Sequence, residues 1–182
     1  MRHLREVYLR FSVQGLAIPS ILLIGLVGAV GFSMPRQAQQ QATGLSITGD
    51  IPAPVHFETV DLDKMPQETA DVTQEDGTTS KYTGVLLRSV LEKAGAPVGR
   101  TLRGKSLASY VLAKARDGYE IVFTLAEMDT TFGNERILLA YKQDGKPLFG
   151  YEGPFRILCP NDKAGARSLR MLDSLEIVRL RK

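Results

Sequence analysis

The residues best suited to bind a ligand lie in one stretch near the C-terminus, which reads GPFRILCPNDKAGARSLR. Its guanidinium groups belong to Arg156, Arg167 and Arg170. Such groups can hold phosphate oxygens through paired hydrogen bonds. Lys163 adds a point charge, and the small residues Gly165 and Ala166 let backbone N–H groups approach an anion. These residue types predict an anion-binding pocket.

A solvated basic loop fits the same residue types equally well. In that interpretation the cations pair with the chain's own carboxylates, and Asp162 and Asp173 lie nearby in the sequence. The only cysteine, Cys159, follows two apolar residues and precedes a proline. This setting is typical of a buried core thiol. A single cysteine also excludes an internal disulfide, so the fold must depend on its hydrophobic core.

Other kinds of catalytic or metal site find no support in the sequence. The chain has two histidines, His3 and His56, and no cysteine and histidine spacing that suits zinc or an iron–sulfur cluster. Glycine-rich dinucleotide and nucleotide-phosphate motifs are also lacking. The segment Phe132 to Arg136 is expected to be a plain loop, and Tyr119 is expected to be a hairpin residue.

The N-terminal segment Leu16 to Met34 contains no charged residue. A helix of this length, at about 1.5 Å per residue, approaches the thickness of a bilayer core, about 30 Å. Arginines precede it, so the positive-inside rule sends the rest of the chain across the membrane. A cleaved signal peptide fits as well, because small residues near its end suit a peptidase. Residues 1–34 are therefore expected to be a signal peptide or membrane anchor, and the domain a periplasmic or other extracytoplasmic one.

The rest of the chain divides into a linker and a folded domain. Residues 35–44 are polar and rich in glutamine, which is typical of a linker, and residues 45–182 are expected to fold. The formal net charge is +3. Three arginines and one glutamate put +2 of it in residues 1–34. The small remainder does not describe a nucleic-acid-binding face, so nucleic acid is not an expected partner.

Hydrophobic spacing in the domain predicts many short strands and few helices. Strands are expected at residues 45–48, 56–62, 70–74, 107–115, 119–125, 137–143, 146–149, 155–159 and 175–180. One helix is expected from Val85 to Ala94, ended by Gly95. Thr124 to Glu127 fits a capping box that opens a second, shorter helix. This pattern indicates a mixed α+β domain that is mainly β.

Three segments, in order, resemble the molybdopterin-binding oxidoreductase domain of the sulfite oxidase family. They are YTGVLLRSVLEKAG, LLAYKQDGKPL and GPFRILCPNDKAGARSLRML, and the resemblance extends over residues 45–182. It implies a mainly β domain of the sulfite-oxidase type that holds a molybdenum pterin. Carried over by residue, it places Arg156 in a Gly-Pro-x-Arg strand. It places Arg167, Ser168 and Arg170 in the loop that grips the pterin phosphate.

The chain departs from the family at the metal ligand. Catalytic members bind molybdenum through a cysteine thiolate that precedes the Thr-Gly-Val turn, and the corresponding region here, ADVTQEDGTTSKYTGV, has no cysteine. Two functions stay open on this basis. One is a molybdopterin oxidoreductase, tethered outside the cytoplasm, that passes electrons to a separate redox or membrane protein. The other is a non-catalytic ligand-binding or accessory module that uses the same fold for a pterin or another anionic small molecule.

Overall fold

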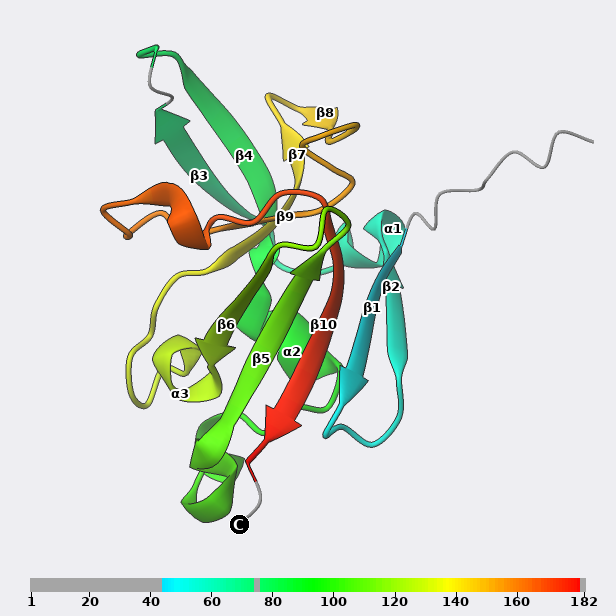
Figure 1. Cartoon of the computed structure of the whole chain (residues 1–182), viewed down its shortest axis with the longest axis vertical. Helices are drawn as coiled ribbons and strands as arrows, with labels where there is room; N and C mark the ends of the chain where they lie inside the picture. The colour runs from blue at the N-terminus through cyan, green and yellow to red at the C-terminus, as the bar shows by residue number, and fades with distance from the viewer. Residues whose placement is uncertain (1–43, 74–75, 181–182) are drawn as a thin grey trace, which may run out of the picture. The chain divides into compact units, whose positions relative to one another are not determined.

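The structure is a computed structural model that describes residues 44–73 and 76–180 (Figure 1). The expected signal peptide or anchor at residues 1–34 lies outside the described residues, as does nearly all of the expected linker. Within the described ranges, the helices are too short or too polar to span a bilayer. The first described strand begins at Gly44.

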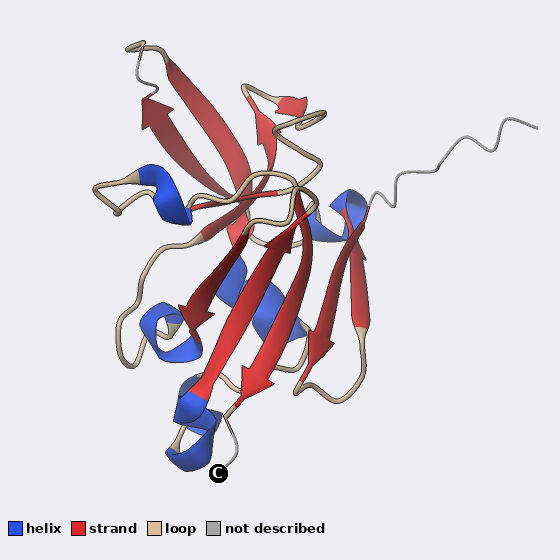
Figure 2. Ribbon diagram, in the orientation of Figure 1, coloured by secondary structure: helices blue, strands red, loops and turns tan. Residues whose placement is uncertain are grey.

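Five strands form the first sheet, in the order β2-β1-β10-β5-β6, which are labelled in Figure 1 and drawn as red arrows in the same orientation in Figure 2. Their bounds are β1 Gly44–Gly49, β2 Val55–Glu58, β5 Ser109–Ala115, β6 Glu120–Thr124 and β10 Leu172–Arg179. β1 and β10 run parallel, whereas the other neighbours are antiparallel. The first and last described strands therefore pair in the middle of one sheet and fasten the two ends of the domain together.

The second sheet has the order β3-β4-β7-β8, and β9 pairs with β7. Its strands are β3 Glu68–Thr73, β4 Thr79–Leu86, β7 Leu138–Gln143, β8 Lys146–Pro147 and β9 Arg156–Leu158. All of its pairings are antiparallel. Two hairpins turn at Gly77 and Gly145, whose φ angles of +82° and +78° explain why glycine follows aspartate there.

Helical segments are short and occupy the connections. They are α1 Thr59–Leu62, α2 Leu87–Lys93, α3 Leu125–Met128, and the 3₁₀ turns η1 Gly99–Thr101, η2 Gly104–Ala108 and η3 Gly165–Arg167. The Thr124 hydroxyl accepts a hydrogen bond from the Glu127 N–H, as the capping-box pattern predicts. Gly95 has φ of +91° immediately after α2, which confirms its predicted role as the end of that helix.

The mainly β prediction is confirmed, but two elements differ from the sequence-based expectation. The strand expected at residues 56–62 ends at Glu58, because a capping box between Glu58 and Asp61 opens α1. Strand β4 was not expected, and its last residues Val85 and Leu86 were assigned to the helix that follows. A continuous apolar run joins β4 to α2, and periodicity cannot separate a buried strand from a helix in such a run.

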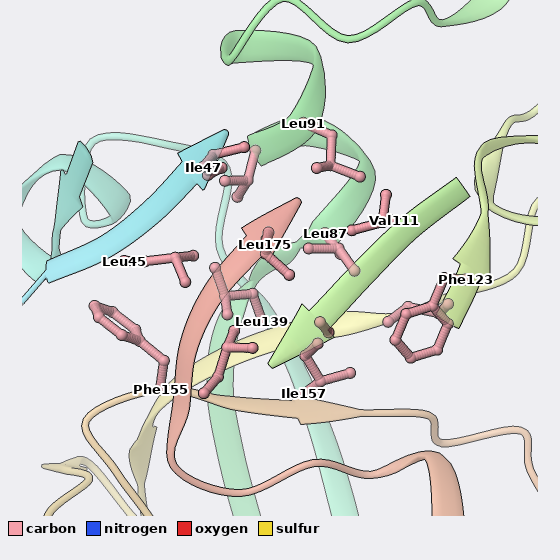
Figure 3. Close-up of a cluster of buried hydrophobic side chains, with 14 of the residues drawn as sticks. Leu45, Ile47, Leu87, Leu91, Val111, Phe123, Leu139, Phe155, Ile157 and Leu175 are labelled. Atoms are coloured by element: carbon pink, nitrogen blue, oxygen red, sulfur yellow. The ribbon is translucent and has the colours of Figure 1, made fainter. Parts of the chain in front are cut away.

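One hydrophobic core is shared by both sheets and α2. Figure 3 shows side chains from β1, β5, β6 and β10 of the first sheet meeting side chains from β7, β9 and α2. The fully buried members include Leu45, Ile47, Val111, Leu175, Leu87, Leu139 and Ile157. Each buried side chain of this size stabilises the fold by about 1.5–3 kcal/mol. A smaller cluster of Tyr82, Leu138, Ala140, Leu148 and Leu158 belongs to the second sheet alone.

The second sheet depends on a glycine at the step in its β4–β7 register. Pairing shifts by one residue between Thr83 and Gly84, and a β-carbon at Gly84 would overlap the carbonyl oxygen of Leu139. We expect Gly84→Ala to lower the free energy of unfolding by about 1–3 kcal/mol, measured by urea denaturation. Gly165→Ala is the matched control, because a β-carbon at Gly165 meets open space. Equal stabilities of the two variants would contradict this account.

Candidate functional site

Strand β9 directs one charged side chain into the interior of the domain. Ile157 belongs to the shared core, whereas Leu158 belongs to the smaller cluster that contains Tyr82. Because successive side chains of a strand point to opposite faces, Arg156 points to the same face as Leu158. Arg156 is only 4% exposed. The strand therefore buries a guanidinium group beside Tyr82.

The buried guanidinium of Arg156 has three recorded contacts. Its Nη1 donates a hydrogen bond to the Tyr82 hydroxyl at 2.8 Å, and it forms an ion pair with the Glu152 carboxylate. Its central carbon lies 4.9 Å from the centroid of the Tyr82 ring, which adds a cation–π contact. Burial raises the pKa of Tyr82, so this phenol stays neutral. Glu152 is thus the charge that compensates Arg156.

Glu152 also binds Arg170. Its other carboxylate oxygen lies 2.8 Å from Arg170 Nε, and the Arg170 guanidinium lies 5.3 Å from the centroid of the Tyr151 ring. One carboxylate therefore bridges two of the arginines that the sequence predicted to bind an anion. We call the two arginines, Arg156 and Arg170, together with the Glu152 carboxylate that joins them, the carboxylate-bridged pair.

Arg167 belongs to a different set of contacts. Its Nε and Nη2 donate to the two oxygens of Asp162 at 2.7 and 2.9 Å, and its Nη1 approaches Glu127 at 3.3 Å. The guanidinium also lies 5.3 Å from the Phe123 ring centroid. The hydrogen bonds from Arg167 lower the pKa of Asp162. Arg167 thus fastens the η3 segment to α3 and to its own loop.

Ser168 and Cys159 join η3 to the end of β9. The Ser168 hydroxyl accepts a hydrogen bond from the Cys159 N–H at 3.3 Å, and the Cys159 thiol donates to the Arg167 carbonyl at 3.6 Å. Burial, followed by the nearby Asp162 carboxylate, raises the pKa of Cys159 to about 12. The prediction of a buried core thiol is confirmed, since Cys159 is 5% exposed. A protonated, buried thiol is not a metal ligand.

Two hollows flank η3, and Gly165 and Ser168 line both of them. The tyrosine hollow, about 260 Å³, is lined by Asp117, Tyr119, Tyr151, Gly165, Ala166, Ser168, Leu169 and Arg170. The lysine hollow, about 270 Å³, is lined by Asp71, Val72, Thr73, Leu158, Cys159, Pro160, Asp162, Lys163, Gly165 and Ser168. The Tyr119 hydroxyl donates to the Ala166 carbonyl at 2.8 Å and so holds the β5–β6 turn against η3.

A third and larger hollow lies next to the carboxylate-bridged pair. The β8 hollow, about 530 Å³, is lined by Gln143, Asp144, Lys146, Pro147, Leu148, Phe149, Gly150, Tyr151 and Glu152. Two of these side chains, Phe149 and Tyr151, are 83% and 63% exposed. Tyr151 lines both the β8 hollow and the tyrosine hollow, so Glu152 and Arg170 lie where these two hollows approach each other.

The structure brings two of the four predicted site residues together and places the others nearby along η3. Arg156 and Arg170 share Glu152, whereas Arg167 and Ser168 hold the loop itself. The alternative of internal pairing is confirmed for Arg167 with Asp162. Glu152 was not singled out from the sequence, although it lies four residues before Arg156. Its spacing could not reveal that Arg170, eighteen positions further on, would share the same carboxylate.

The loop from Phe132 to Arg136 is structural, as expected. The N–H groups of Phe132 and Asn134 donate to the Asp129 carbonyl at 3.1 and 2.9 Å. Asp129 is fully buried, and its carboxylate accepts hydrogen bonds from the Gly99 and Thr131 N–H groups at 2.6 and 2.8 Å. Burial opposes ionisation of Asp129, but these hydrogen bonds prevail and lower its pKa. Among residues 44–73 and 76–180, no cluster of histidine, cysteine and carboxylate side chains could hold a metal ion.

Comparisons with known proteins point to one kind of domain. The sequence model of a family described as "Oxidoreductase molybdopterin binding domain" matches residues 32–182. Among solved structures, 25 chains match. One is the crystal structure of the sulfane dehydrogenase SoxCD from Paracoccus pantotrophus, with a TM-score of 0.55 and 19% identity. The match covers 74% of this chain and 37% of that chain, and at this identity it shows the fold alone. No curated protein sequence matches the chain.

The buried thiol leads to a direct prediction. At pH 8 a thiol with a pKa of about 12 is almost entirely protonated, whereas an ordinary cysteine with a pKa of about 8.5 is roughly a quarter thiolate. We expect Cys159 in the native chain to react with a disulfide reagent at least about a hundredfold more slowly than in the guanidinium-unfolded chain. Equal rates in the two states would show that the thiol is accessible and ionised.

Proposed function

Because the chain belongs to the oxidoreductase molybdopterin binding domain family, we propose that it binds a molybdopterin-type cofactor along η3. In this proposal the anionic part of the pterin lies against η3 and the carboxylate-bridged pair. The protein provides no thiolate for the metal. When bound, such a cofactor supplies redox chemistry, while the protein supplies binding and orientation.

The observation that carries this proposal is the position of η3 between two hollows. Gly165 and Ser168 line both the tyrosine hollow and the lysine hollow, and a β-carbon at Gly165 would meet open space. A ligand lying along η3 could therefore reach backbone N–H groups without moving the fold. Arg170 lines one hollow and Lys163 lines the other, so positive charge is available on both sides.

The residues present fit the anionic part of the cofactor. Arg156 Nε is buried and has no hydrogen-bond partner in the part of the chain that the structure describes. Such a buried donor is costly unless an acceptor satisfies it, and a phosphate oxygen is a suitable acceptor. In the proposed complex Arg156 and Arg170 hold the phosphate, Ser168 positions the β9–η3 junction, and Arg167 keeps η3 in place through Asp162.

The residues do not fit a molybdenum ion bound through the protein. Cys159 is buried, its thiol donates to the Arg167 carbonyl, and its pKa is about 12. The described part of the β3–β4 hairpin, where the family's ligand would be expected, contains no cysteine. We therefore propose a domain that is degenerate in its usual catalytic step. The lack of a thiolate ligand for molybdenum also favours the second candidate function, a non-catalytic accessory module that binds a pterin.

The location and the partners form part of the proposal. The uncharged segment Leu16 to Met34, preceded by arginines, supports placement of the domain outside the cytoplasm by an anchor or a signal peptide. Any electrons that a bound cofactor handles would pass to a separate redox or membrane protein, since the sequence has no haem or flavin motif. Protein expressed with its N-terminal segment would partition with membranes under the anchor hypothesis and appear in the extracytoplasmic soluble fraction under the signal-peptide hypothesis.

The test is cofactor analysis of the full chain purified from its native compartment. We expect pterin, detected by fluorescence after oxidation, at close to one equivalent. Gly165→Leu should lower the pterin content at least about tenfold, because its side chain would extend into the space beside η3. Ala108→Leu is the matched control, since Ala108 is exposed and lines none of the three hollows.

Metal analysis of the same samples separates the two candidate functions. Molybdenum in proportion to pterin supports the oxidoreductase, whereas pterin without molybdenum supports the accessory module. A wild-type chain without pterin, or a Gly165→Leu variant that retains its full pterin content, would contradict the proposal.

A further inference from the structure

We propose that Arg156 and Arg170 form an oxyanion-binding site that the Glu152 carboxylate occupies in the ligand-free chain. A phosphate-bearing ligand binds the two arginines by displacing this carboxylate. This inference rests on the proposed function for the role of the two arginines, and it adds that the chain's own carboxylate competes with the ligand. The ligand class is a phosphate monoester or a similar oxyanion, recognised through two guanidinium groups.

The burial of Arg156 requires an anion at this position. Its side chain is 5% exposed, whereas that of Glu152 is 31% exposed. Removing the partner of a buried charge is strongly destabilising, because an uncompensated charge remains in the interior. An anion at this position therefore stabilises the folded domain. Glu152 fills this role from the protein, and an external oxyanion can fill it from solution.

Glu152 leaves much of the hydrogen-bonding capacity of the two arginines unused. It meets Arg156 at Nη1, whereas the buried Arg156 Nε has no acceptor within the part of the chain that the structure describes. It meets Arg170 at Nε, 2.8 Å away, but the N–H is not aligned for a hydrogen bond. Among residues 44–73 and 76–180, no other hydrogen bond or ion pair involves the Arg170 guanidinium. A tetrahedral oxyanion has more oxygens than a carboxylate and could bind each guanidinium through two nitrogens.

The position of Glu152 allows its side chain to turn away from the two arginines. Glu152 lies in a loop that runs from the exposed Gly150 to the buried Gly153, its own side chain is partly exposed, and it lines the β8 hollow, which offers about 530 Å³ for the displaced side chain. Arg116 holds both ends of this loop, because its Nη2 donates to the carbonyl groups of Gly150 and Gly153. The backbone can therefore stay in place while the carboxylate turns away.

The opposite side of the pair is open to an incoming ligand. Arg170 lines the tyrosine hollow, whose wall includes the rings of Tyr119 and Tyr151. These two residues are 47% and 63% exposed, and the Arg170 guanidinium already lies over the Tyr151 ring. A ligand with a phosphate at one end and a planar ring at the other would place its phosphate on the arginines and its ring against tyrosine.

The experiment is a titration of the full chain with inorganic phosphate by calorimetry, supported by thermal unfolding. Glu152→Gln keeps the size of the side chain and removes the competing charge. We expect it to bind phosphate at least about tenfold more tightly than the wild type. Phosphate should also raise its unfolding temperature by at least about 5 °C more than that of the wild type. Phosphate affinity no tighter than that of the wild type would overturn the proposal.

A second variant keeps the proposal testable if Glu152→Gln does not fold. Glu152→Asp retains the charge but is one methylene shorter, so it cannot bridge both guanidiniums, and it should bind phosphate more tightly than the wild type. Adding Arg170→Gln to either variant should abolish the gain. Glu176→Gln is the control, because it removes a carboxylate from the exposed pair with Lys114 and should leave phosphate binding unchanged. A gain in Glu176→Gln equal to that in the Glu152 variants would also overturn the proposal.

The outcome is independent of the cofactor analysis. A gain in phosphate affinity without pterin in the purified chain would uphold the displacement of Glu152 and contradict the proposed cofactor. Pterin in the wild-type chain without a gain in either Glu152 variant would uphold the cofactor and contradict the displacement.

Discussion

The buried guanidinium of Arg156 is the constraint on which the arrangement of the site depends. β9 pairs with β7 on one side, and on the other the Ile157 N–H donates to the Leu169 carbonyl at 2.8 Å. Just before β9, the Phe155 carbonyl accepts a hydrogen bond from the N–H of Leu172, the first residue of β10, at 2.9 Å. A charge in this position requires compensation within the domain. Glu152 provides the opposite charge and Tyr82 a hydrogen bond, and Arg116 holds the loop that carries Glu152 by donating to the carbonyl groups of Gly150 and Gly153.

The two arginines of the η3 region, Arg167 and Arg170, differ in how many carboxylates of the chain bind them. Arg167 is held by both oxygens of Asp162 and by Glu127, so its main effect is to fix η3. Arg170 shares Glu152 through one nitrogen and lines a hollow. Internal pairing, one of the two alternatives that the sequence left open, therefore describes Arg167, whereas the anion-binding pocket stays a prediction for Arg156 and Arg170.

Local signals in the sequence predicted most of the strands, though not β4, and also α3 and the end of α2, because turns, capping boxes and glycines act over a few residues. The family resemblance was also predictable, since it rests on three short segments in order. The boundary between β4 and α2 was not predictable, because Val85 and Leu86 continue an apolar run. The bridge made by Glu152 was also hidden, since it joins Arg156, whose other partner Tyr82 lies far earlier in the chain, to Arg170 in another loop. Only the fold brings these residues together.

The most direct test is a crystal structure of the chain grown or soaked in saturating phosphate. The account predicts a tetrahedral anion between Arg156 and Arg170, with Arg156 Nε bonded to one of its oxygens and the Glu152 carboxylate turned into the β8 hollow. A structure in which Glu152 still bridges both guanidinium groups at saturating phosphate would contradict it.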